Sequence, residues 1–329
     1  MGIDVDALVE RVLAGDRRGM ARAISLVEDG APELEPLSAA LYPHTGAAAT
    51  VGLTGSPGVG KSSLTEHLVR AARSRDRSVA VLAIDPTSPF TGGALLGDRL
   101  RMQTHATDPH VFIRSMATRG HLGGMALAAP EAIRILDAAG TDLVMVETVG
   151  VGQAEVEVAG ATDTTLVVVA PGWGDAVQVA KAGILEIADV FVVNKADRDG
   201  AGEAARDLQL MLKMGQARDA AWTPPVVKTS AATGEGVEDL WEAIESHRKH
   251  LESTGALERD RRERLMAEVQ TLASQRVRER VHAALDADAE LAGRLAGRQV
   301  DPYRAASMLL ERVAEAEARP ARPGDGPDG

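Results

Sequence analysis

The stretch Gly55-Ser56-Pro57-Gly58-Val59-Gly60-Lys61-Ser62 decides the fold of this chain. It matches the pattern G-x-x-x-x-G-K-[ST], a loop that cradles the phosphates of a nucleotide. Its glycines let successive backbone N–H groups turn inward as an anion-binding nest. Residues 49–54 are typical of a short buried strand, and residues 62–73 have the apolar spacing of a helix. Strand, loop and helix together favour a phosphate site over a glycine-rich turn that contains lysine by chance.

The candidate phosphate ligands follow from this match. Lys61 is expected to reach the β- and γ-phosphates, which makes it a catalytic candidate as well, and the Ser62 hydroxyl is expected to ligate Mg²⁺. The helix that follows would point its amino end at the phosphates. The expected nucleotide-binding residues of this loop are Gly55, Ser56, Pro57, Gly58, Val59, Gly60, Lys61, Ser62 and Ser63.

Composition narrows the function classes. The 329 residues carry a formal net charge of −12 and include three Trp, two Tyr and three Phe. Nucleic-acid binding needs basic patches and usually aromatic platforms, so we expect no nucleic-acid partner. Cysteine is absent, which excludes disulfides, thiolate metal sites and cysteine nucleophiles. We see no signal peptide and no apolar run long enough to span a bilayer, so we expect a soluble, cytoplasmic protein without membrane contact.

The chain alternates strand and helix between residues 46 and 250, which predicts an α/β core. We expect a P-loop NTPase fold with a mostly parallel sheet flanked by helices. The apolar runs at 165–169 and 190–193 are typical of central strands. The other expected strands are 49–54, 78–85, 111–115, 143–147 and 225–229. Residues 1–45 are predicted to form a helical extension, 251–315 a helical arm and 316–329 a disordered tail.

A second motif follows the apolar run 190–193. Asn194-Lys195-Ala196-Asp197 matches the N-K-x-D guanine reader of GTPases. One carboxylate accepts hydrogen bonds from both N1–H and the 2-amino group of guanine, whereas adenine offers neither donor, and such a pair can discriminate by about 10⁴. We therefore expect Asn194, Lys195 and Asp197 to bind the base. Ser230, Ala231 and Ala232 resemble the loop whose backbone N–H meets guanine O6; an ordinary small-residue turn is the alternative.

Acidic residues near the expected strand ends are candidate metal ligands. They are Asp85, Asp98 and Glu147, to which Ser62 is added. Mg²⁺ takes few carboxylates and several waters, so we expect most contacts to run through water. Glu147 also opens a segment in which GTPases usually carry D-x-x-G, and the N–H of Gly150 would sense the γ-phosphate. Asp85 as a strand-end cap and Asp98 as a solvated acid are the alternatives.

The catalytic machinery of fast GTPases is incomplete here. Val151 follows Gly150, where Ras-like proteins carry a water-orienting glutamine, and the nearest amide is Gln153. The sequence identifies no arginine finger. We therefore expect slow intrinsic GTP hydrolysis.

Five segments, in this order, resemble the MeaB/ArgK family of P-loop GTPases, the methylmalonyl-CoA-mutase-associated G-protein chaperones. They are residues 55–63, 84–89, 113–120, 147–153 and 194–197. The resemblance covers roughly residues 5 to 312. It implies a homodimer held by the C-terminal arm, with catalytic roles for Lys61 and Glu147 and a metal role for Ser62, Asp85, Asp98 and Glu147.

The resemblance also implies a partner. Proteins of this family bind an adenosylcobalamin-dependent acyl-CoA mutase, gate its cofactor loading through GTP hydrolysis, and protect or reactivate it; the cobalamin belongs to the mutase. Residues 171–181 look like the family's extra switch loop, in which Asp175, Gln178 and Lys181 are the polar, catalytic candidates. The glycines at 172 and 174 would make this loop deformable. An ordinary strand-to-helix loop is the alternative.

Three alternative functions are considered from the sequence. A nickel-type metallochaperone GTPase shares the P-loop but usually needs cysteines or a His-rich tract, whereas this chain has no Cys and eight scattered His. An ATP-dependent kinase of transport proteins conflicts with the guanine motif. A nucleotide-stabilised scaffold would hydrolyse nothing useful. The sequence does not identify which acyl-CoA mutase is served.

Overall fold

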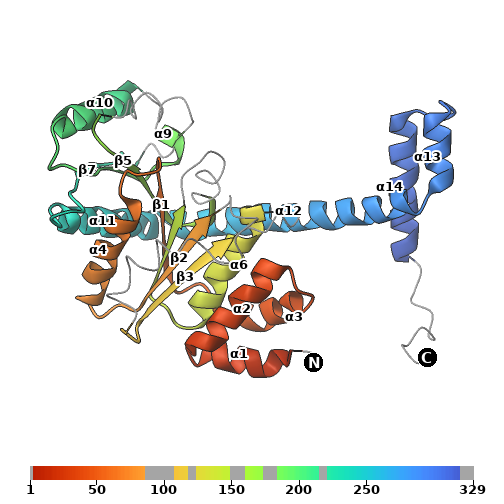
Figure 1. Ribbon diagram of the computed structural model, residues 1–329, viewed down its shortest axis with the longest axis horizontal. Helices are drawn as coiled ribbons and strands as arrows, with labels where there is room; N and C mark the ends of the chain where they lie inside the picture. The colour runs from red at the N-terminus through yellow and green to blue at the C-terminus, as the bar shows by residue number, and fades with distance from the viewer. Residues whose placement is uncertain are drawn as a thin grey trace. The chain divides into compact units, whose positions relative to one another are not determined.

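A computed structural model describes residues 3–85, 107–117, 124–148, 160–172, 184–214 and 221–318 of the chain. The described strands form one sheet in the order β3-β2-β4-β1-β5-β6-β7 (Figure 1). Every neighbouring pair is parallel, which confirms the predicted α/β core. The strands are β1 (Ala49–Thr54), β2 (Val79–Asp85), β3 (Val111–Ala117), β4 (Leu143–Thr148), β5 (Thr164–Val169), β6 (Val190–Val193) and β7 (Val226–Lys228).

Four interior strands of the sheet are mostly apolar and are buried along their whole length. Each residue of β1, β4, β5 and β6 is shielded from solvent. This is the pattern of parallel strands covered on both faces, so the central position predicted for 165–169 and 190–193 is confirmed. All seven strand positions expected from the sequence are present, with ends within two residues of the predicted ones.

Helices cover both faces of the sheet. On one face lie α4 (Lys61–Arg73) and α11 (Val237–Thr254); on the other lie α6 (Gly124–Ala138) and α10 (Ala201–Met214), with the short α9 (Ile184–Ile187) before β6. Alternate residues of β5 pack against the helices on the two faces of the sheet. Leu166 and Val168 pack with α4 and α11, whereas Val167 and Val169 pack with α10. Successive strand side chains point to opposite faces, which explains this division.

The amino-terminal segment forms a layer on α6, as the helical periodicity predicts. It comprises α1 (Val5–Leu13), α2 (Arg17–Asp29), α3 (Leu34–Leu41) and the 3₁₀ turn η1 (Tyr42–His44). Asp4 and Asp16 cap the first two helices by accepting from backbone N–H groups of the first turn. The apolar stripe of these helices, which includes Leu8, Val12 and Ile24, is buried against α6.

The chain divides into two compact units, residues 1–265 and 266–329. The long α12 (Ala256–Asp286) is followed by α13 (Ala289–Ala296) and α14 (Pro302–Ala318). Within the second unit, Leu291, Val300, Ala305 and Leu309 form a small buried cluster. Other apolar side chains stay exposed, and Tyr303 is 89% accessible. None of the helices in the described part of the chain has the length and apolar character to cross a membrane.

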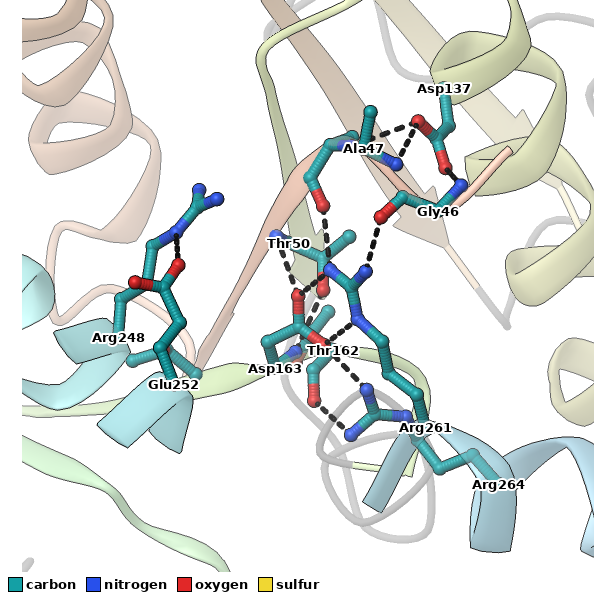
Figure 2. Close-up of polar contacts among 12 residues, drawn as sticks. Gly46, Ala47, Thr50, Asp137, Thr162, Asp163, Arg248, Glu252, Arg261 and Arg264 are labelled. Atoms are coloured by element: carbon teal, nitrogen blue, oxygen red, sulfur yellow. Dashed lines mark hydrogen bonds and ion pairs between the residues drawn. The ribbon is translucent and has the colours of Figure 1, made fainter. Parts of the chain in front are cut away.

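An ion cluster around a buried carboxylate joins the first turns of α12 to the amino-terminal edge of the sheet (Figure 2). Asp163, directly before β5, is its centre. Arg261 donates to both carboxylate oxygens, at 3.0 and 2.6 Å, and Arg264 donates to Oδ1 at 2.5 Å. The spacing of three residues places both arginines on one side of the helix. This cluster was not predicted from the sequence.

The same cluster holds the start of β1. Arg261 donates to the carbonyls of Gly46 (2.6 Å) and Ala48 (2.7 Å), and the N–H of Asp163 donates to Thr50 Oγ1 (2.7 Å). Burial acts to raise the pKa of Asp163, but the hydrogen bond and charge of Arg261, together with Arg264, outweigh it, so the pKa lies below its ordinary value. Asp163 is therefore ionised at neutral pH. Its charge is matched by two guanidinium groups that reach the protein surface.

Candidate nucleotide-binding site

The phosphate-binding loop, residues 55–62, which we call the P-loop, follows β1 and runs into the start of α4 at the carboxyl edge of the sheet. Gly55, Gly58 and Gly60 have φ values of +138°, +80° and +100°, which glycine adopts without strain. A Cβ on Gly55 would also overlap the carbonyl oxygen of Val168 in β5. The loop therefore requires glycine at position 55 for space as well as for conformation. Its position after a central strand is where open α/β sheets bind ligands.

Lys61 is the first residue of α4 and is almost fully buried, with 6% of its surface exposed. Its Nζ donates to the carbonyls of Gly55 (2.6 Å) and Ser56 (3.1 Å). The ammonium group thus lies inside the curve of the P-loop. The backbone N–H groups at the start of α4 add positive potential there. This arrangement suits a polyphosphate.

Ser62 and Glu147 form the oxygen-rich part of the site. Glu147 is the penultimate residue of β4 and is paired in register with Leu53 of β1, so it lies beside the P-loop strand. It is 6% exposed, and Ser62 Oγ donates to its Oε1 at 2.5 Å. Thr65 Oγ1 lies 3.1 Å from the other carboxylate oxygen. Thr65 was not among the predicted site residues, although its spacing of three from Ser62 was a signal for it.

These residues fit Mg²⁺. A hydroxyl and a carboxylate are hard oxygen donors, and Mg²⁺ commonly combines one or two such groups with waters and phosphate oxygens. Among the residues that the structure describes, no group of three or more acidic or histidine side chains forms a protein-only metal cage. The donor set therefore matches a cation that takes most of its ligands from water and substrate.

The other metal candidates are less completely described. Asp85 ends β2, one residue beyond Ile84, which pairs with Thr148 of β4. Its backbone therefore lies at the same edge of the sheet as Glu147. Asp98 and Gly150 fall outside the described residues, as do the switch-loop candidates Asp175, Gln178 and Lys181.

The segment Asn194–Asp197, which we call the base loop, follows β6 and contacts the P-loop. Asn194 is 1% exposed, and its Nδ2 donates to the carbonyl of Val59 at 2.8 Å. A Cβ on Gly60 would overlap this amide nitrogen. Lys195 reaches the same loop, donating from Nζ to the carbonyl of Gly58 at 2.6 Å. The two motifs, far apart in sequence, are thus in direct contact.

Asn194 also contacts the segment Ser230–Ala232, which we call the S-A loop. Its Oδ1 accepts from Thr229 Oγ1 (3.2 Å) and from the N–H of Ala231 (3.0 Å). On the other side of this loop, the ring Nε2 of His67 in α4 lies 3.0 Å from the carbonyl oxygen of Ala231. One amide side chain therefore joins the P-loop, the base loop and the S-A loop.

Asp197 is exposed and has a defined partner. Ser230 Oγ donates to its Oδ1 at 2.6 Å, and this hydrogen bond is the main reason why the pKa of Asp197 lies below its ordinary value. The carboxylate is therefore ionised at neutral pH. An ionised carboxylate is the acceptor that the two donors of a guanine edge require.

Fold and site define the class: the chain is a P-loop nucleoside triphosphatase. A family model described as "Methylmalonyl Co-A mutase-associated GTPase MeaB" matches residues 20–286. The chain belongs to this family of GTPases, which confirms the resemblance and the predicted enzyme class.

Related proteins cover nearly the same length. A Pyrococcus horikoshii protein is 49% identical over 311 residues, 94% of this chain and 98% of its own. The GTPase ArgK of Escherichia coli is 37% identical over 78% of this chain and 79% of its own. The Mus musculus protein named methylmalonic aciduria type A homolog, mitochondrial, is 33% identical over 93% of this chain and 79% of its own. A crystal structure described as LAO/AO transport system kinase has a TM-score of 0.71 at 26% identity, covering 97% of this chain and 100% of its own.

Proposed function

We propose that this GTPase is a chaperone of an adenosylcobalamin-dependent acyl-CoA mutase, with methylmalonyl-CoA mutase as the first candidate. It would gate cofactor loading and protect or reactivate the mutase. The family description names association with methylmalonyl-CoA mutase, and the mouse relative is named for methylmalonic aciduria. The observation that carries the nucleotide part is the hydrogen bond from Asn194 to Val59, because it joins the phosphate loop to the base loop.

In this proposal each loop contacts one part of GTP. Lys61 and the backbone N–H groups of residues 55–63 bind the phosphates, and Asp197 accepts from the guanine edge. The S-A loop meets guanine O6. Ser62 and Glu147 would hold Mg²⁺, with Asp85 and Asp98 acting through water. When bound, Mg²⁺ would offset negative charge on the phosphate oxygens.

Hydrolysis is proposed to be slow until the mutase binds. Val151 replaces the water-orienting glutamine of Ras-like proteins, so this chain supplies no evident group to position the attacking water. Asp175, Gln178 and Lys181 are proposed to respond to the partner. A turnover on the order of 10 s⁻¹ by the isolated protein, the rate of a partner-stimulated GTPase, would contradict this step.

The decisive experiment titrates purified mutase against the GDP-bound and GTP-analogue-bound protein. Coupling between sites is reciprocal, so a mutase that prefers one nucleotide state must bind the two forms with different affinity. We expect a difference of at least fivefold, together with stimulated GTP hydrolysis. Equal affinities and unchanged hydrolysis would remove the chaperone model. Tighter binding of ATP than GTP would instead favour the transport-kinase alternative, and stoichiometric nickel binding the metallochaperone.

We further propose that the functional form is a homodimer in the cytoplasm. The second unit exposes a set of large apolar side chains that a second copy can cover: Met266, Val269, Leu272, Val277, Tyr303 and Leu310. Such a set is typical of an interaction surface. Light scattering after size exclusion should give twice the chain mass of 34.5 kDa. A monomer at micromolar concentration would contradict the proposal.

A further inference from the structure

Thr65 lies in the second turn of α4 and is fully buried, with 0% of its surface exposed. Its hydroxyl is within hydrogen-bond distance of two acceptors, the carbonyl of Lys61 (3.0 Å) and Oε2 of Glu147 (3.1 Å). A helical threonine can satisfy its hydroxyl on the carbonyl four residues earlier without any further partner. The hydroxyl has one proton, so the approach to Glu147 is an additional contact in which this proton is shared with the carbonyl of Lys61. It connects α4 to the end of β4.

Ser62 and Thr65 are three residues apart, so their side chains lie on the same face of α4. Ser62 faces Oε1 of Glu147 and Thr65 faces Oε2. Two hydroxyls one turn apart therefore hold the two oxygens of one carboxylate, and they fix its orientation as well as its position. Hydrogen bonds to an ionised acceptor are stronger than those between neutral groups.

These two hydroxyl contacts are important because the site has glutamate where many GTPases have aspartate. The extra methylene adds a rotatable bond, and a longer side chain loses more conformational freedom when it is held in one orientation. Glu147 is 6% exposed, so bulk water has little access to it. A buried hydroxyl beside the carboxylate is a direct means of holding it.

We propose that Thr65 is a positioning residue for Glu147, which it holds toward the Mg²⁺ and γ-phosphate side of the site. The inference rests on the proposed role of Ser62 and Glu147 in binding Mg²⁺. There Ser62 would turn its oxygen to the cation, and the hydroxyl of Thr65 would keep its contact with Oε2 of Glu147. Thr65 would act through Glu147 and not through a contact of its own with nucleotide or metal.

The test measures nucleotide binding rather than turnover. Affinity for a fluorescent GDP is determined in EDTA and across a Mg²⁺ titration for the wild type and for Thr65→Val, which keeps the side-chain shape and removes the hydroxyl. The Mg²⁺ concentration for half-maximal effect should rise about tenfold in this variant, which corresponds to about 1.4 kcal/mol. Affinity in EDTA should change less than twofold. Thr65→Ser, which restores the hydroxyl, should return the Mg²⁺ midpoint to within about threefold of the wild type.

Thr165→Val is the matched control. Thr165 is 1% exposed, and within the described part of the chain its hydroxyl has no hydrogen-bond partner. The same substitution there should leave both the Mg²⁺ midpoint and the EDTA affinity unchanged. Thr65→Ala repeats the test with a smaller side chain, so that a poorly folded Thr65→Val does not decide the outcome.

Two results would overturn the inference while leaving the metal site intact. One is an unchanged Mg²⁺ midpoint in both hydroxyl-free variants. The other is an equal loss of affinity in EDTA and in Mg²⁺, which would mean that Thr65 only supports the P-loop. If the affinity of the wild type for GDP did not depend on Mg²⁺, the proposed metal site would be wrong and this inference with it. That result is seen in the wild type alone, so it is distinguishable from a failure of the inference about Thr65.

Discussion

The side-chain amide of Asn194 donates a 2.8 Å hydrogen bond to the backbone carbonyl of Val59, although 135 residues separate them. The bond is buried, and the same amide accepts from the backbone N–H of Ala231. The protein's own hydrogen bonds therefore join the phosphate motif to the base motif. A binding site held in place by such contacts loses less conformational entropy when its ligand binds.

Gly60→Ala should disrupt this contact. The new methyl group would overlap Asn194 Nδ2 at a position where φ is +100°. We expect GTP affinity to fall at least tenfold, as measured by fluorescent-nucleotide titration. Gly46→Ala is the control, because Gly46 has a similar φ of +108° and no atom within 4 Å of the added methyl. It should cost about 1–2 kcal/mol of stability without changing GTP affinity. Equal affinity losses in the two variants would show that the Asn194 contact is irrelevant.

Lys61→Ala should weaken triphosphate binding. The lysine ammonium lies inside the P-loop, 2.6 Å from the carbonyl of Gly55, where it would face the β- and γ-phosphates. Since a charged hydrogen-bonding group contributes about 1.5–3 kcal/mol, we expect GTP affinity to fall at least tenfold. Guanosine affinity should be nearly unchanged, because the base loop is intact. A comparable loss for guanosine would mean that the variant disturbs the whole site.

Asp163→Asn tests the ion cluster at the opposite edge of the sheet. The substitution would leave Arg261 and Arg264 without their shared carboxylate. We expect a loss of about 2–3 kcal/mol in the free energy of unfolding of the first unit, because the two guanidinium groups can still reach water. Urea denaturation measures it. The guanine preference should be unchanged, since the P-loop lies at the other end of β1. A loss below about 0.5 kcal/mol would show that the cluster is energetically neutral.

The same cluster predicts a pH dependence. The pKa of Asp163 is depressed in the folded protein, so its contribution to stability is complete above its unfolded value near 3.8 and is lost as the pH falls through the folded pKa. The stability difference between the wild type and Asp163→Asn should therefore be constant from pH 7 to pH 5 and shrink below pH 4. A difference that grows on acidification would contradict the assignment.

The sequence predicted the sheet and both loops because these depend on local patterns. Apolar runs mark the buried strands, and the P-loop and base motifs have fixed spacing relative to strand ends. Asn194 and Lys61 therefore lie where the motifs predict, at the carboxyl edge of a parallel sheet.

Contacts between distant segments were not predictable in this way. Arg261 and Asp163 are 98 residues apart, and helical periodicity indicates which side of α12 carries the arginine but not which acid it meets. Thr65 was missed for a related reason. A buried threonine in an apolar helix face looks like packing until the carboxylate from β4 is placed beside it.

The most direct measurement of the central claim compares GTP, XTP and ATP in competition binding to the wild type and to Asp197→Asn. The exchange replaces an acceptor with a donor, while the amide oxygen can still accept from Ser230. The account predicts that the wild type prefers GTP over both competitors and that the variant prefers XTP over GTP by at least tenfold, because xanthine carries a carbonyl at C2 where guanine has an amine. An unchanged preference for GTP in the variant, or equal binding of ATP and GTP by the wild type, would contradict the account.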